Sequence, residues 1–462
     1  MSDNTCSGRN AVVLGLGLTG LSLARHLVRH GARVTVADTR AAPPFADRLA
    51  AALPDVPVVT GPFTAATFAT ADLIAISPGI DRRTPAVAAA IRRGTPVAGD
   101  IEFFLQALPQ HARPLPRIVA VTGTNGKSTT TQMAGDICAA AGHSIVVAGN
   151  IGTPVLDTLT AIENGRAAPS AFVLELSSFQ LESTASLNAD AATMLNLSED
   201  HLDRYDGMAD YAAAKARVFH GDGAQVLNRD DTRSAAMALP GREVLSFGLD
   251  APDSERTWGI AQRDGKIWLA RGDRTLMAVD ELPIAGLHNA ANALAAGALC
   301  HAIGVADAPI VKGWREFKGL PHRVEKVAAI DGVNYYDDSK GTNVGSTVAA
   351  LNGFTQPVVL IAGGDGKGQD FSPLREPVKR RARAVVLIGR DREQIAIAIA
   401  GSGVAIERAG DMVAAVRLAR AASRSGDAVL LSPACASYDM FRNYGHRGEV
   451  FADAVRKEVV RG

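Results

Sequence analysis

The sequence IVAVTGTNGKSTT, at residues Ile118–Thr130, has the layout of a phosphate-binding loop. An apolar strand leads into a glycine-rich loop, and the loop runs into the start of a helix. In such loops the backbone amides hold phosphate oxygens, a lysine reaches the β- and γ-phosphates, and a hydroxyl binds Mg²⁺. Val121 stands where the common GxxxxGK pattern has its first glycine, so this loop is a variant. We predict that it binds ATP through Gly123, Thr124, Asn125, Gly126, Lys127, Ser128 and Thr129.

A second glycine-rich loop lies near the start of the chain, at Gly15–Gly20 (GLGLTG). It connects the apolar segment Ala11–Leu14 to a helical pattern over Leu18–His30, and Asp38 ends the next predicted strand. Glycines at this spacing let the backbone approach a diphosphate at a helix N-terminus, and the acidic residue would accept from a ribose hydroxyl. The pattern favours a nucleotide or nucleotide-sugar diphosphate over NAD(P) alone. Tight packing of the strand on the helix is the alternative explanation.

Apolar strands and amphipathic helices alternate along the chain, which is typical of an α/β protein with parallel sheets. The segment Gln106–Arg117 contains three prolines and is predicted to be a linker. Between Val244 and Val279 the pattern changes to strands with a tight Arg-Asp-Gly turn, which predicts a small antiparallel insert. We predict a Rossmann-like domain at residues 1–102, a central P-loop-type ATPase domain with a parallel sheet at 103–320, and a second Rossmann-like domain at 321–462.

The composition excludes several classes of protein. The 462 residues include 48 Lys+Arg and 48 Asp+Glu, whereas a generic nucleic-acid binder carries a basic excess. The four cysteines lie far apart with no CxxC pair, which argues against a disulfide framework or zinc ribbon and fits a reducing compartment. The start MSDNTCSGRN lacks the apolar core of a signal peptide, and the apolar stretch Ile395–Ile406 is too short to span a bilayer. We expect a cytoplasmic monomer with no nucleic-acid or membrane partner.

Three side chains downstream of the phosphate loop are candidates to act with it. Glu175 ends an apolar strand and is placed to hold Mg²⁺, as acids beside phosphate loops do. His201 follows another apolar strand, and its residue type alone allows either a metal ligand or an ordinary surface histidine. Lys215 lies in the helical stretch Tyr211–Phe219, where a lysine usually only extends its stem along apolar neighbours. The sequence leaves the structural explanation open for all three residues, and for Glu175 this is a solvated carboxylate at the end of a strand.

The loop GTNGKST after an apolar strand resembles the phosphate loop of the Mur ligases and of the related folylpolyglutamate synthases. In Mur ligases, the residues that match Glu175 and His201 hold a second Mg²⁺, and the lysine that matches Lys215 carries a carbamate formed from CO₂. The resemblance therefore implies ATP and two Mg²⁺ ions as cofactors. It implies metal ligands at Ser128, Glu175, His201 and carbamylated Lys215, and catalytic roles for Lys127, His201, Lys215 and Arg323.

The last third of the chain carries further motifs of the same family. The segment Gly319–Arg323 (GLPHR) is similar to the family's hinge motif, in which Arg323 would clamp the γ-phosphate. The resemblance also implies that Asn289 contacts the adenine side of ATP and that Asp338 contacts its ribose. The sequences DSKGTN (residues 338–343) and SPACAS (residues 432–437) are similar to the members that add D-glutamate. The resemblance implies amino-acid contacts from Lys340, Thr342, Lys367, Ser437, Tyr438 and Tyr444, the last at a position where phenylalanine is familiar.

The motifs of the first domain also resemble those of the D-glutamate-adding members, so the resemblance covers essentially the whole chain. It implies an ATP-dependent ligase that joins D-glutamate to UDP-N-acetylmuramoyl-L-alanine through an acyl phosphate, in cytoplasmic peptidoglycan precursor synthesis. Its partners would be these two small molecules and ATP. The implied contacts to the UDP-sugar are Leu18, Thr19, Asp38, Thr39, Arg40, Ser77, Gly79, Asn150 and His201.

Other functions remain as alternatives to this one. Another Mur ligase, or a ligase like folylpolyglutamate synthase, would use a different amino acid, although folylpolyglutamate synthases lack an N-terminal GxGxxG domain of this kind. An NAD(P)-dependent dehydrogenase would use the first glycine loop for its cofactor. A P-loop switch protein would use ATP only to bind partners.

Overall fold

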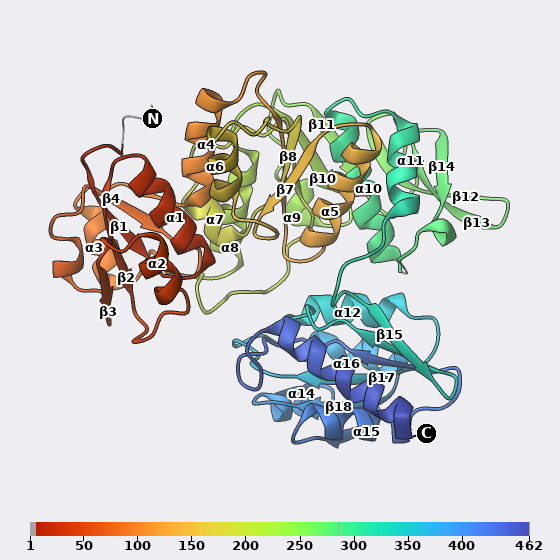
Figure 1. Cartoon of the computed structure of the whole chain (residues 1–462). Helices are drawn as coiled ribbons and strands as arrows, with labels where there is room; N and C mark the ends of the chain where they lie inside the picture. Colours follow the sequence, from red (N-terminus) through yellow and green to blue (C-terminus); the bar gives the residue numbers. More distant parts are fainter. Residues whose placement is uncertain (1–5, 285, 462) are drawn as a thin grey trace.

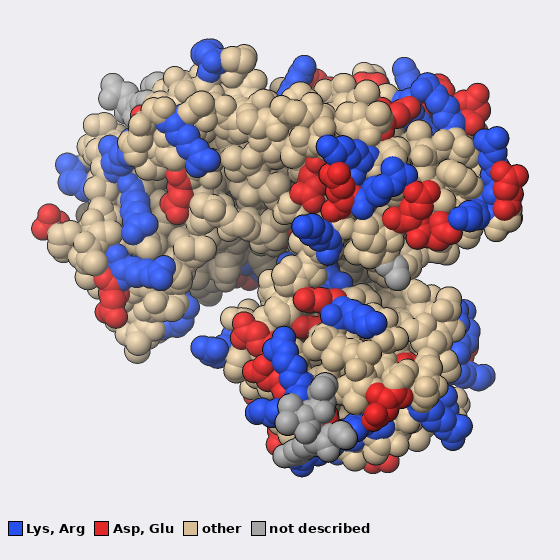
Figure 2. All heavy atoms as spheres, turned by 45° about the vertical axis from the view of Figure 1, so that its right-hand side comes forward, with Lys and Arg blue, Asp and Glu red and all other residues tan. Residues whose placement is uncertain are grey.

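The computed structural model describes residues 6–284 and 286–461, and these residues form three α/β domains in succession along the chain. Within them each domain has a sheet of its own, with five, nine and six strands. Figure 1 shows the N-terminal domain in red beside the middle domain in orange to green, with the C-terminal domain in blue below the middle domain. The surface is hollowed where the domains approach one another, and Lys/Arg and Asp/Glu side chains are intermixed on the face in Figure 2. The predicted fold class is confirmed.

The N-terminal domain is built on a parallel sheet of strand order β3-β2-β1-β4-β5. The central strand β1 is an almost continuous apolar run because helices cover both faces of such a sheet. The strand order reverses beside β1, so the loop that follows it opens into the crevice where this class of sheet binds ligands. The elements are β1 (Asn10–Leu14), α1 (Leu18–Arg29), β2 (Arg33–Asp38), α2 (Ala46–Ala52), β3 (Val58–Thr60), β4 (Leu73–Ile76), α3 (Pro85–Arg92) and β5 (Val97–Ala98).

The middle domain places its phosphate-loop strand, β6, at the centre of a parallel sheet between β8 and β9. The helices α5, α10 and α11 pack against one another beside this sheet (Figure 1). The elements of the sheet's parallel part are α4 (Asp100–His111), β6 (Arg117–Thr122), α5 (Lys127–Ala140), β7 (Ile145–Gly149), α6 (Val155–Glu163), β8 (Ala171–Glu175), α7 (Ser178–Glu182), β9 (Ala191–Met194), α8 (Met208–Ala216), β10 (Ala224–Asn228), α9 (Thr232–Ala235) and β11 (Val244–Phe247), and the domain ends with α10 (Leu287–Ala302) and α11 (Asp307–Glu316).

The predicted antiparallel insert is present as β12 (Thr257–Arg263), β13 (Lys266–Arg271) and β14 (Arg274–Ala278). It does not form a separate sheet. Strand β11 pairs in parallel with both β10 and β12, so the antiparallel strands extend the main sheet at one edge. The antiparallel strands therefore share a hydrophobic core with the rest of the middle domain, in which Trp258 is fully buried.

The predicted linker over Gln106–Arg117 is wrong for its first half. Helix α4 continues to His111 and carries Pro109 in its last turn, and its buried residues include Phe104 and Leu108. A proline near the end of a helix removes only one backbone hydrogen bond, and burial of this apolar face outweighs that loss. Because α4 begins at Asp100, the predicted domain boundary at 102/103 falls inside the helix.

The C-terminal domain has a six-stranded sheet of order β15-β16-β20-β17-β18-β19. Strands β15 and β16 are antiparallel, and the other pairs are parallel. The adjacent strands β16, β20 and β17 end at the same edge of the sheet. The elements are β15 (Glu325–Ile330), β16 (Val333–Asp337), α12 (Val344–Gly353), β17 (Val358–Gly363), α13 (Arg375–Arg381), β18 (Ala382–Ile388), α14 (Arg392–Ala398), β19 (Ala405–Arg408), α15 (Met412–Ala422), β20 (Ala428–Leu431) and α16 (Tyr444–Arg461).

Two expectations from composition concern the whole chain. All four cysteines lie within the described residues, and each is a free thiol, as expected. Among residues 6–284 and 286–461, no helix combines the length and apolar character that crossing a bilayer requires. The first five residues of the polar N-terminal segment lie outside the described part of the chain.

Candidate active site

The phosphate loop runs from the end of β6 to the start of α5, as the sequence predicts. Gly126 lies immediately before α5 with a φ of +83°, a conformation that favours glycine. A Cβ at this position would clash with the side-chain amide of Asn292 on α10. The loop is further fixed by Asn196, whose side chain accepts from Asn125 N at 2.8 Å and donates to Asn125 O at 3.0 Å. The loop is therefore held in shape by its neighbours before any ligand arrives.

Two lysines bind the backbone of this loop. Lys127 Nζ donates to Gly123 O and Thr124 O at 3.0 and 2.8 Å, and Lys215 Nζ donates to Gly123 O at 2.8 Å. Lys215 is buried, and its burial, together with the charge of Lys127, lowers the pKa of its amine well below the ordinary value. Burial likewise lowers the pKa of Lys127, while Glu175 opposes the shift. Two ammonium groups this close together favour a neutral amine at Lys215.

Glu175, at the end of β8, offers a carboxylate oxygen that suits a metal ion. The residue is 1% exposed, and Asn150 Nδ2 donates to its Oε1 at 2.8 Å. Its Oε2 is buried and has no hydrogen-bond donor among the described residues. Burial acts to raise the pKa of Glu175, but the charges of Lys127 and Lys340 outweigh it and lower that pKa, so the group is an anion. A buried carboxylate with an unsatisfied oxygen fits Mg²⁺.

Cationic side chains of the C-terminal domain reach the phosphate loop across the domain interface. Arg323 Nη2 and Lys340 Nζ donate to Ser128 Oγ at 3.0 and 2.9 Å. The structure thus brings together a residue from the hinge segment, one from the loop after β16, and the hydroxyl of the phosphate loop. Partial burial, and then the charge of Arg323, lower the pKa of Lys340 to about 8. Two cations that converge on this hydroxyl can stabilise the negative charge of a bound phosphate group.

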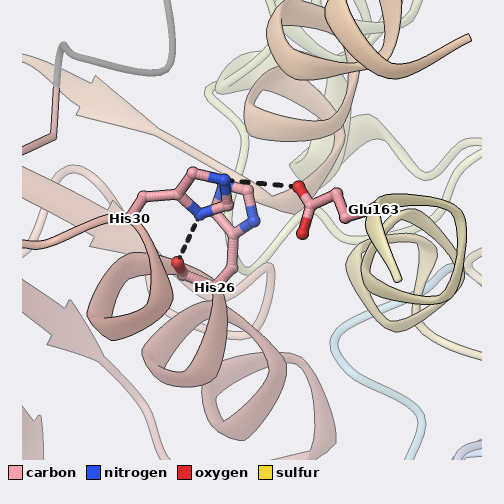
Figure 3. Close-up of side chains that lie close together, drawn as sticks. All are labelled: His26, His30 and Glu163. Atoms are coloured by element: carbon pink, nitrogen blue, oxygen red, sulfur yellow. Dashed lines mark hydrogen bonds and ion pairs between the residues drawn. The ribbon is translucent and has the colours of Figure 1, made fainter. Parts of the chain in front are cut away.

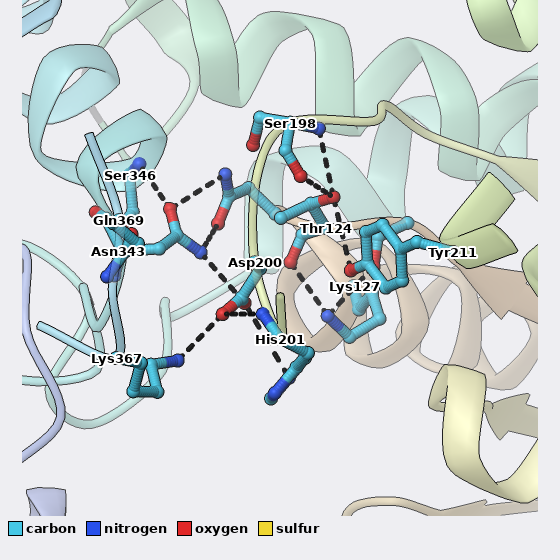
Figure 4. Close-up of polar contacts among 12 residues, drawn as sticks. Thr124, Lys127, Ser198, Asp200, His201, Tyr211, Asn343, Ser346, Lys367 and Gln369 are labelled. Atoms are coloured by element: carbon cyan, nitrogen blue, oxygen red, sulfur yellow. Dashed lines mark hydrogen bonds and ion pairs between the residues drawn. The ribbon is translucent and has the colours of Figure 1, made fainter. Parts of the chain in front are cut away.

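A second group of contacts between the two domains centres on Asp200 (Figure 4). Lys367 Nζ binds its Oδ1 at 2.7 Å, and Asn343 Nδ2 donates to its Oδ2 at 3.3 Å. Asn343 also donates to Asn125 Oδ1 at 3.0 Å, and so connects the phosphate loop to the start of α12. Burial raises the pKa of Asp200, and Lys367 and His201 outweigh this effect, so that pKa is lowered.

Asp200, Asn196 and Asn343 are absent from the predicted site residues, although all three stand in motifs that the sequence displays. Asn196 and Asp200 lie in the segment after β9, and Asn343 follows DSKGT. Their position just beyond the carboxyl ends of strands was the available signal, because parallel strands of one sheet end at the same edge.

His201 lies in the loop that faces the N-terminal domain. Its ring centroid is 4.7 Å from that of Phe179, and partial burial lowers its pKa to about 4, so the ring is neutral near pH 7. Three residues on, Arg204 donates to Pro78 O and Ile80 O at 2.8 and 3.1 Å. The histidine loop is therefore attached to the loop after β4, in which the predicted UDP-sugar contacts Ser77 and Gly79 lie.

A cavity of about 370 Å³ lies beside the phosphate loop, between the middle and C-terminal domains. Its size is typical of a pocket for a small organic ligand. Six predicted ATP contacts line it, namely Asn289, Arg323 and Asp338 together with Asn125, Gly126 and Thr129 of the loop. Burial raises the pKa of Asp338 to about 7, and Ser432 Oγ donates to its Oδ2 at 2.7 Å. Apolar walls suited to a flat base come from Phe247, Leu249, Ile284, Phe317 and Leu320.

The glycine loop of the N-terminal domain folds tightly around Gly20. A Cβ at Gly20 would overlap the carbonyl oxygen of Gly15, whereas a Cβ at Gly17 would have no heavy atom within 4 Å. Gly17 precedes α1, so the space beside it lies at a helix N-terminus. Ser77 Oγ donates to Gly15 O at 3.0 Å and holds the turn from the β4 side.

Asp38 is already occupied by protein groups. Leu16 N donates to its Oδ2 at 2.6 Å, and the Arg40 guanidinium binds both of its oxygens at 2.9 and 2.6 Å. The Arg40 hydrogen bond lowers the pKa of Asp38 to about 2. Through its hydrogen bond with Leu16 N, Asp38 therefore helps to hold the glycine loop in place. Thr39, the Arg40 side chain and Leu18 are exposed around this turn, and Thr19 is partly exposed.

The predicted amino-acid contacts gather at the carboxyl edge of the C-terminal sheet. Lys340 and Thr342 follow β16, Lys367 follows β17, and Ser437 and Tyr438 follow β20. Tyr444 begins α16, and the Lys340 ammonium lies 5.3 Å from its ring centroid. Ser437 is buried, whereas Tyr438 is 75% exposed. Lys367 is directed at Asp200, so in this structure its ammonium is paired with a protein carboxylate.

Comparisons with known proteins cover the same three domains. The models described as Mur ligase MurD-like, N-terminal domain; Mur ligase middle domain; and Mur ligase, glutamate ligase domain match residues 9–99, 121–300 and 322–435. A curated relative from Thiobacillus denitrificans, UDP-N-acetylmuramoylalanine--D-glutamate ligase, is 57% identical over 98% of this chain and 97% of its own. A protein of the same name from Methylobacillus flagellatus is 56% identical over 98% of both chains.

Solved structures share the fold at lower identity. UDP-N-acetylmuramate-alanine ligase from Thermotoga maritima matches with a TM-score of 0.61 at 18% identity, over 97% of this chain and 100% of that one. MurF from Acinetobacter baumannii matches with a TM-score of 0.61 at 17% identity, over 98% of this chain and 92% of that one.

A phosphate loop in a middle domain, with cations from a third domain that converge on its hydroxyl, defines an ATP-dependent ligase of three α/β domains. The three matching models and the identity to curated relatives then make the family plain. The chain belongs to the Mur ligase family.

Proposed function

We propose that this chain joins D-glutamate to UDP-N-acetylmuramoyl-L-alanine with hydrolysis of ATP to ADP, a step in peptidoglycan precursor synthesis. The curated relatives at 57% and 56% identity carry the name of this activity over nearly the full chain. The structural observation that carries the proposal is the convergence of Arg323 and Lys340 on Ser128, because it unites the ATP loop with the domain predicted to bring the amino acid.

Each domain has one task in this proposal. Residues 1–102 hold the UDP-sugar at the glycine loop, residues 103–320 hold ATP, and residues 321–462 bring D-glutamate and close over the nucleotide. The contact of Arg204 with the loop of Ser77 and Gly79 supports a continuous path from the first site to the second. A cytoplasmic location and a monomeric state remain predictions from the sequence.

The chemistry consists of two substitutions. A carboxylate oxygen of the substrate's L-alanine attacks the γ-phosphorus of ATP, so a C–O–P bond forms and the bond to ADP breaks. The neutral D-glutamate amine then attacks the acyl carbon, an amide forms, and phosphate leaves with the bridging oxygen while the nitrogen loses one proton and keeps the other. Lys127 and Arg323 stabilise the charge that develops on the transferred phosphoryl group. Domain closure excludes the water that would hydrolyse the acyl phosphate.

The residues present fit Mg²⁺. The unsatisfied Oε2 of Glu175, the Ser128 hydroxyl and the neutral ring of His201 are the donors that would hold it, and we propose two ions. When bound, Mg²⁺ neutralises phosphate charge and polarises the phosphoryl group for attack. Ser128 Oγ now accepts from Arg323 and Lys340, so these cations would move to the phosphate oxygens when the nucleotide occupies the site.

Lys215 supports a further proposal, that its amine is carbamylated. A neutral amine adds CO₂ through a new N–C bond and loses one proton, which gives an anion in place of the neutral amine. Burial and the neighbouring Lys127 both favour the neutral amine. Lys215→Ala should lower activity by at least about 100-fold, the scale of losing a preorganised charge at the reacting centre. Intact-mass spectra of wild type with ¹³C-bicarbonate after chemical trapping of the carbamate should show one label, and an unlabelled protein at full activity would contradict the proposal.

The decisive test of function is ADP release in the presence of defined substrates. We expect release only when UDP-N-acetylmuramoyl-L-alanine, D-glutamate and Mg²⁺ are all present, with amide product in equal amount. Lys127→Met should abolish it, and His143→Gln, at an exposed position of the same domain, should not. Release with L-lysine, meso-diaminopimelate or L-alanine in place of D-glutamate would move the chain to another specificity within the family. ADP release independent of any amino acid would refute the proposal.

A further inference from the structure

Three helices from two domains meet at a cluster of imidazoles around one carboxylate. His26 lies on α1 of the N-terminal domain, His30 caps the C-terminus of that helix one turn later, and Glu163 ends α6 of the middle domain (Figure 3). One ligand atom from each of these residues lies within 4.8 Å of the other two. His111, the last residue of α4, places its Nε2 3.8 Å from Glu163 Oε1. This cluster has no part in the proposed ligase reaction.

The hydrogen bonds of His30 determine which of its nitrogens faces the carboxylate. Its Nδ1 lies 2.7 Å from the carbonyl oxygen of His26, and because a carbonyl only accepts, Nδ1 is the donor. In the neutral ring Nε2 then carries the lone pair, and it lies 3.3 Å from Glu163 Oε1. Two electron-pair donors at this distance are held together either by a proton on Nε2 or by a metal cation between them. A backbone carbonyl that orients the ring through the other nitrogen is the usual support of a metal-bound histidine.

The cluster is partly enclosed and has a suitable composition. The side chains of Glu163 and His30 are 4% and 12% exposed, and His26 is 4% exposed. Arg29 Nε lies 2.8 Å from Glu163 Oε2, so this oxygen is paired and Oε1 is directed at the histidines. Imidazole nitrogens with one carboxylate oxygen are ligands for Zn²⁺ and similar transition metals rather than for Mg²⁺.

We propose that His26, His30 and Glu163 bind a divalent transition metal ion, with Zn²⁺ as the physiological candidate, at the junction of the N-terminal and middle domains. His111, whose Nε2 lies 3.8 Å from Glu163 Oε1, is the candidate for a fourth ligand. The role is structural, because the ion would join α1 to α6. These helices already meet through Ser22 Oγ, which donates to Asp157 Oδ1 at 2.6 Å. Since α1 begins at the glycine loop, the metal would fix the orientation of the predicted UDP-sugar site relative to the middle domain.

Cobalt is the probe that tests this site, because Co²⁺ replaces Zn²⁺ and gives visible d–d absorption that depends on its ligands. Tag-free full-length protein, freed of metal by chelation and kept in excess Mg²⁺ without nucleotide, is titrated with Co²⁺. We expect absorption that saturates at one equivalent and is abolished by Zn²⁺. His26→Gln combined with His30→Gln should weaken Co²⁺ binding by at least about 100-fold, and Glu163→Gln should weaken it by at least about 10-fold. His143→Gln, at an exposed histidine, is the matched control.

A thermal measurement keeps the test valid if the variants are less stable. Zn²⁺ should raise the midpoint of unfolding of wild type and of His143→Gln, because a ligand that binds only the folded state stabilises it. It should not raise the midpoint of the double variant. The competing explanation is an ion pair of protonated His30 with Glu163. In that case wild type shows no cobalt absorption and no response to Zn²⁺, and the proposal is overturned. Cobalt binding of equal strength in the double variant overturns it as well.

Discussion

Replacement of Gly17 by alanine should weaken binding of the UDP-sugar to the N-terminal domain without changing the stability of that domain. Gly17 has φ −96° and ψ −163°, values that alanine adopts freely, and its added Cβ would have no heavy atom within 4 Å. Alanine is worse than glycine before a helix by about 0.5 kcal/mol, and it restricts the unfolded chain by about 0.4–1 kcal/mol. These effects oppose each other, so we expect the free energy of unfolding to stay within about 0.5 kcal/mol of wild type.

Binding of the UDP-sugar should respond very differently. If the diphosphate lies against Gly17 at the start of α1, the new methyl group pushes it from a backbone amide. A hydrogen bond to a charged group contributes about 1.5–3 kcal/mol. At 1.4 kcal/mol per tenfold change, the Kd for UDP-N-acetylmuramoyl-L-alanine should rise by about 10- to 150-fold. Isothermal titration calorimetry with this substrate measures the change, and an ATP analogue should bind as it does to wild type.

Gly20→Ala is the contrasting variant. Its Cβ would overlap the carbonyl oxygen of Gly15, so the loop must shift. Such overpacking costs about 1–3 kcal/mol, and both stability and substrate affinity should fall. Wild-type affinity of Gly17→Ala for the UDP-sugar would refute the reasoning, because it would mean that the diphosphate does not lie at this glycine. A large loss of stability in Gly17→Ala would equally contradict the geometry.

Three further predictions concern the catalytic region. Glu175→Gln retains the oxygen that accepts from Asn150, so its thermal stability should equal that of wild type. Its kcat should fall by about 100-fold or more, and its activity should require a higher Mg²⁺ concentration. An unchanged kcat would exclude the proposed metal-binding role of Glu175. Lys367→Met should raise the KM for D-glutamate by about 10- to 150-fold and preserve ATP affinity, because one charge-assisted hydrogen bond to the amino acid, of about 1.5–3 kcal/mol, is lost. A wild-type KM in steady-state kinetics would disprove the predicted contact of Lys367 with D-glutamate. The pKa of Lys340 is about 8, and its ammonium is present below that pH and lost above it, so ATP affinity should fall as pH rises through about 8. Calorimetry just above pH 8 in buffers of different ionisation enthalpy should show proton uptake on ATP binding, and Lys340→Met should show none.

Much of the fold could be predicted because its signals are local. The phosphate loop and the glycine loop each combine a strand, a turn and a helix within about a dozen residues, and such units have few possible geometries. The linker prediction failed because it relied on the three prolines, and the sequence did not show that the apolar face of helix α4 is buried. Helix α4 is stabilised by side chains such as Phe104, whose ring lies 4.9 Å from that of Phe172 on β8. That contact is between residues distant in sequence.

In the candidate site too, the sequence indicated several of the residues, whereas their contacts are known only from the structure. Lys127 and Ser128 at the start of α5, with Glu175 at the end of β8, indicated the ATP region, and their predicted roles remain to be tested. The occupation of Asp38 by Arg40, the pairing of Lys367 with Asp200 and the bridge from Asn343 to Asn125 appear only in the folded chain. Residue type gives the charge of a side chain but not its partner.

By itself the sequence determined three α/β domains, an ATP loop and the family to which these motifs belong. Only the tertiary structure decided that Arg323 and Lys340 converge on Ser128, and that two histidines of the first domain face a glutamate of the second. The physical reason is the distance along the chain over which each kind of interaction acts. Backbone propensities and glycine conformations act over a few neighbouring residues, whereas electrostatic and hydrogen-bond partners are set by the packing of whole domains.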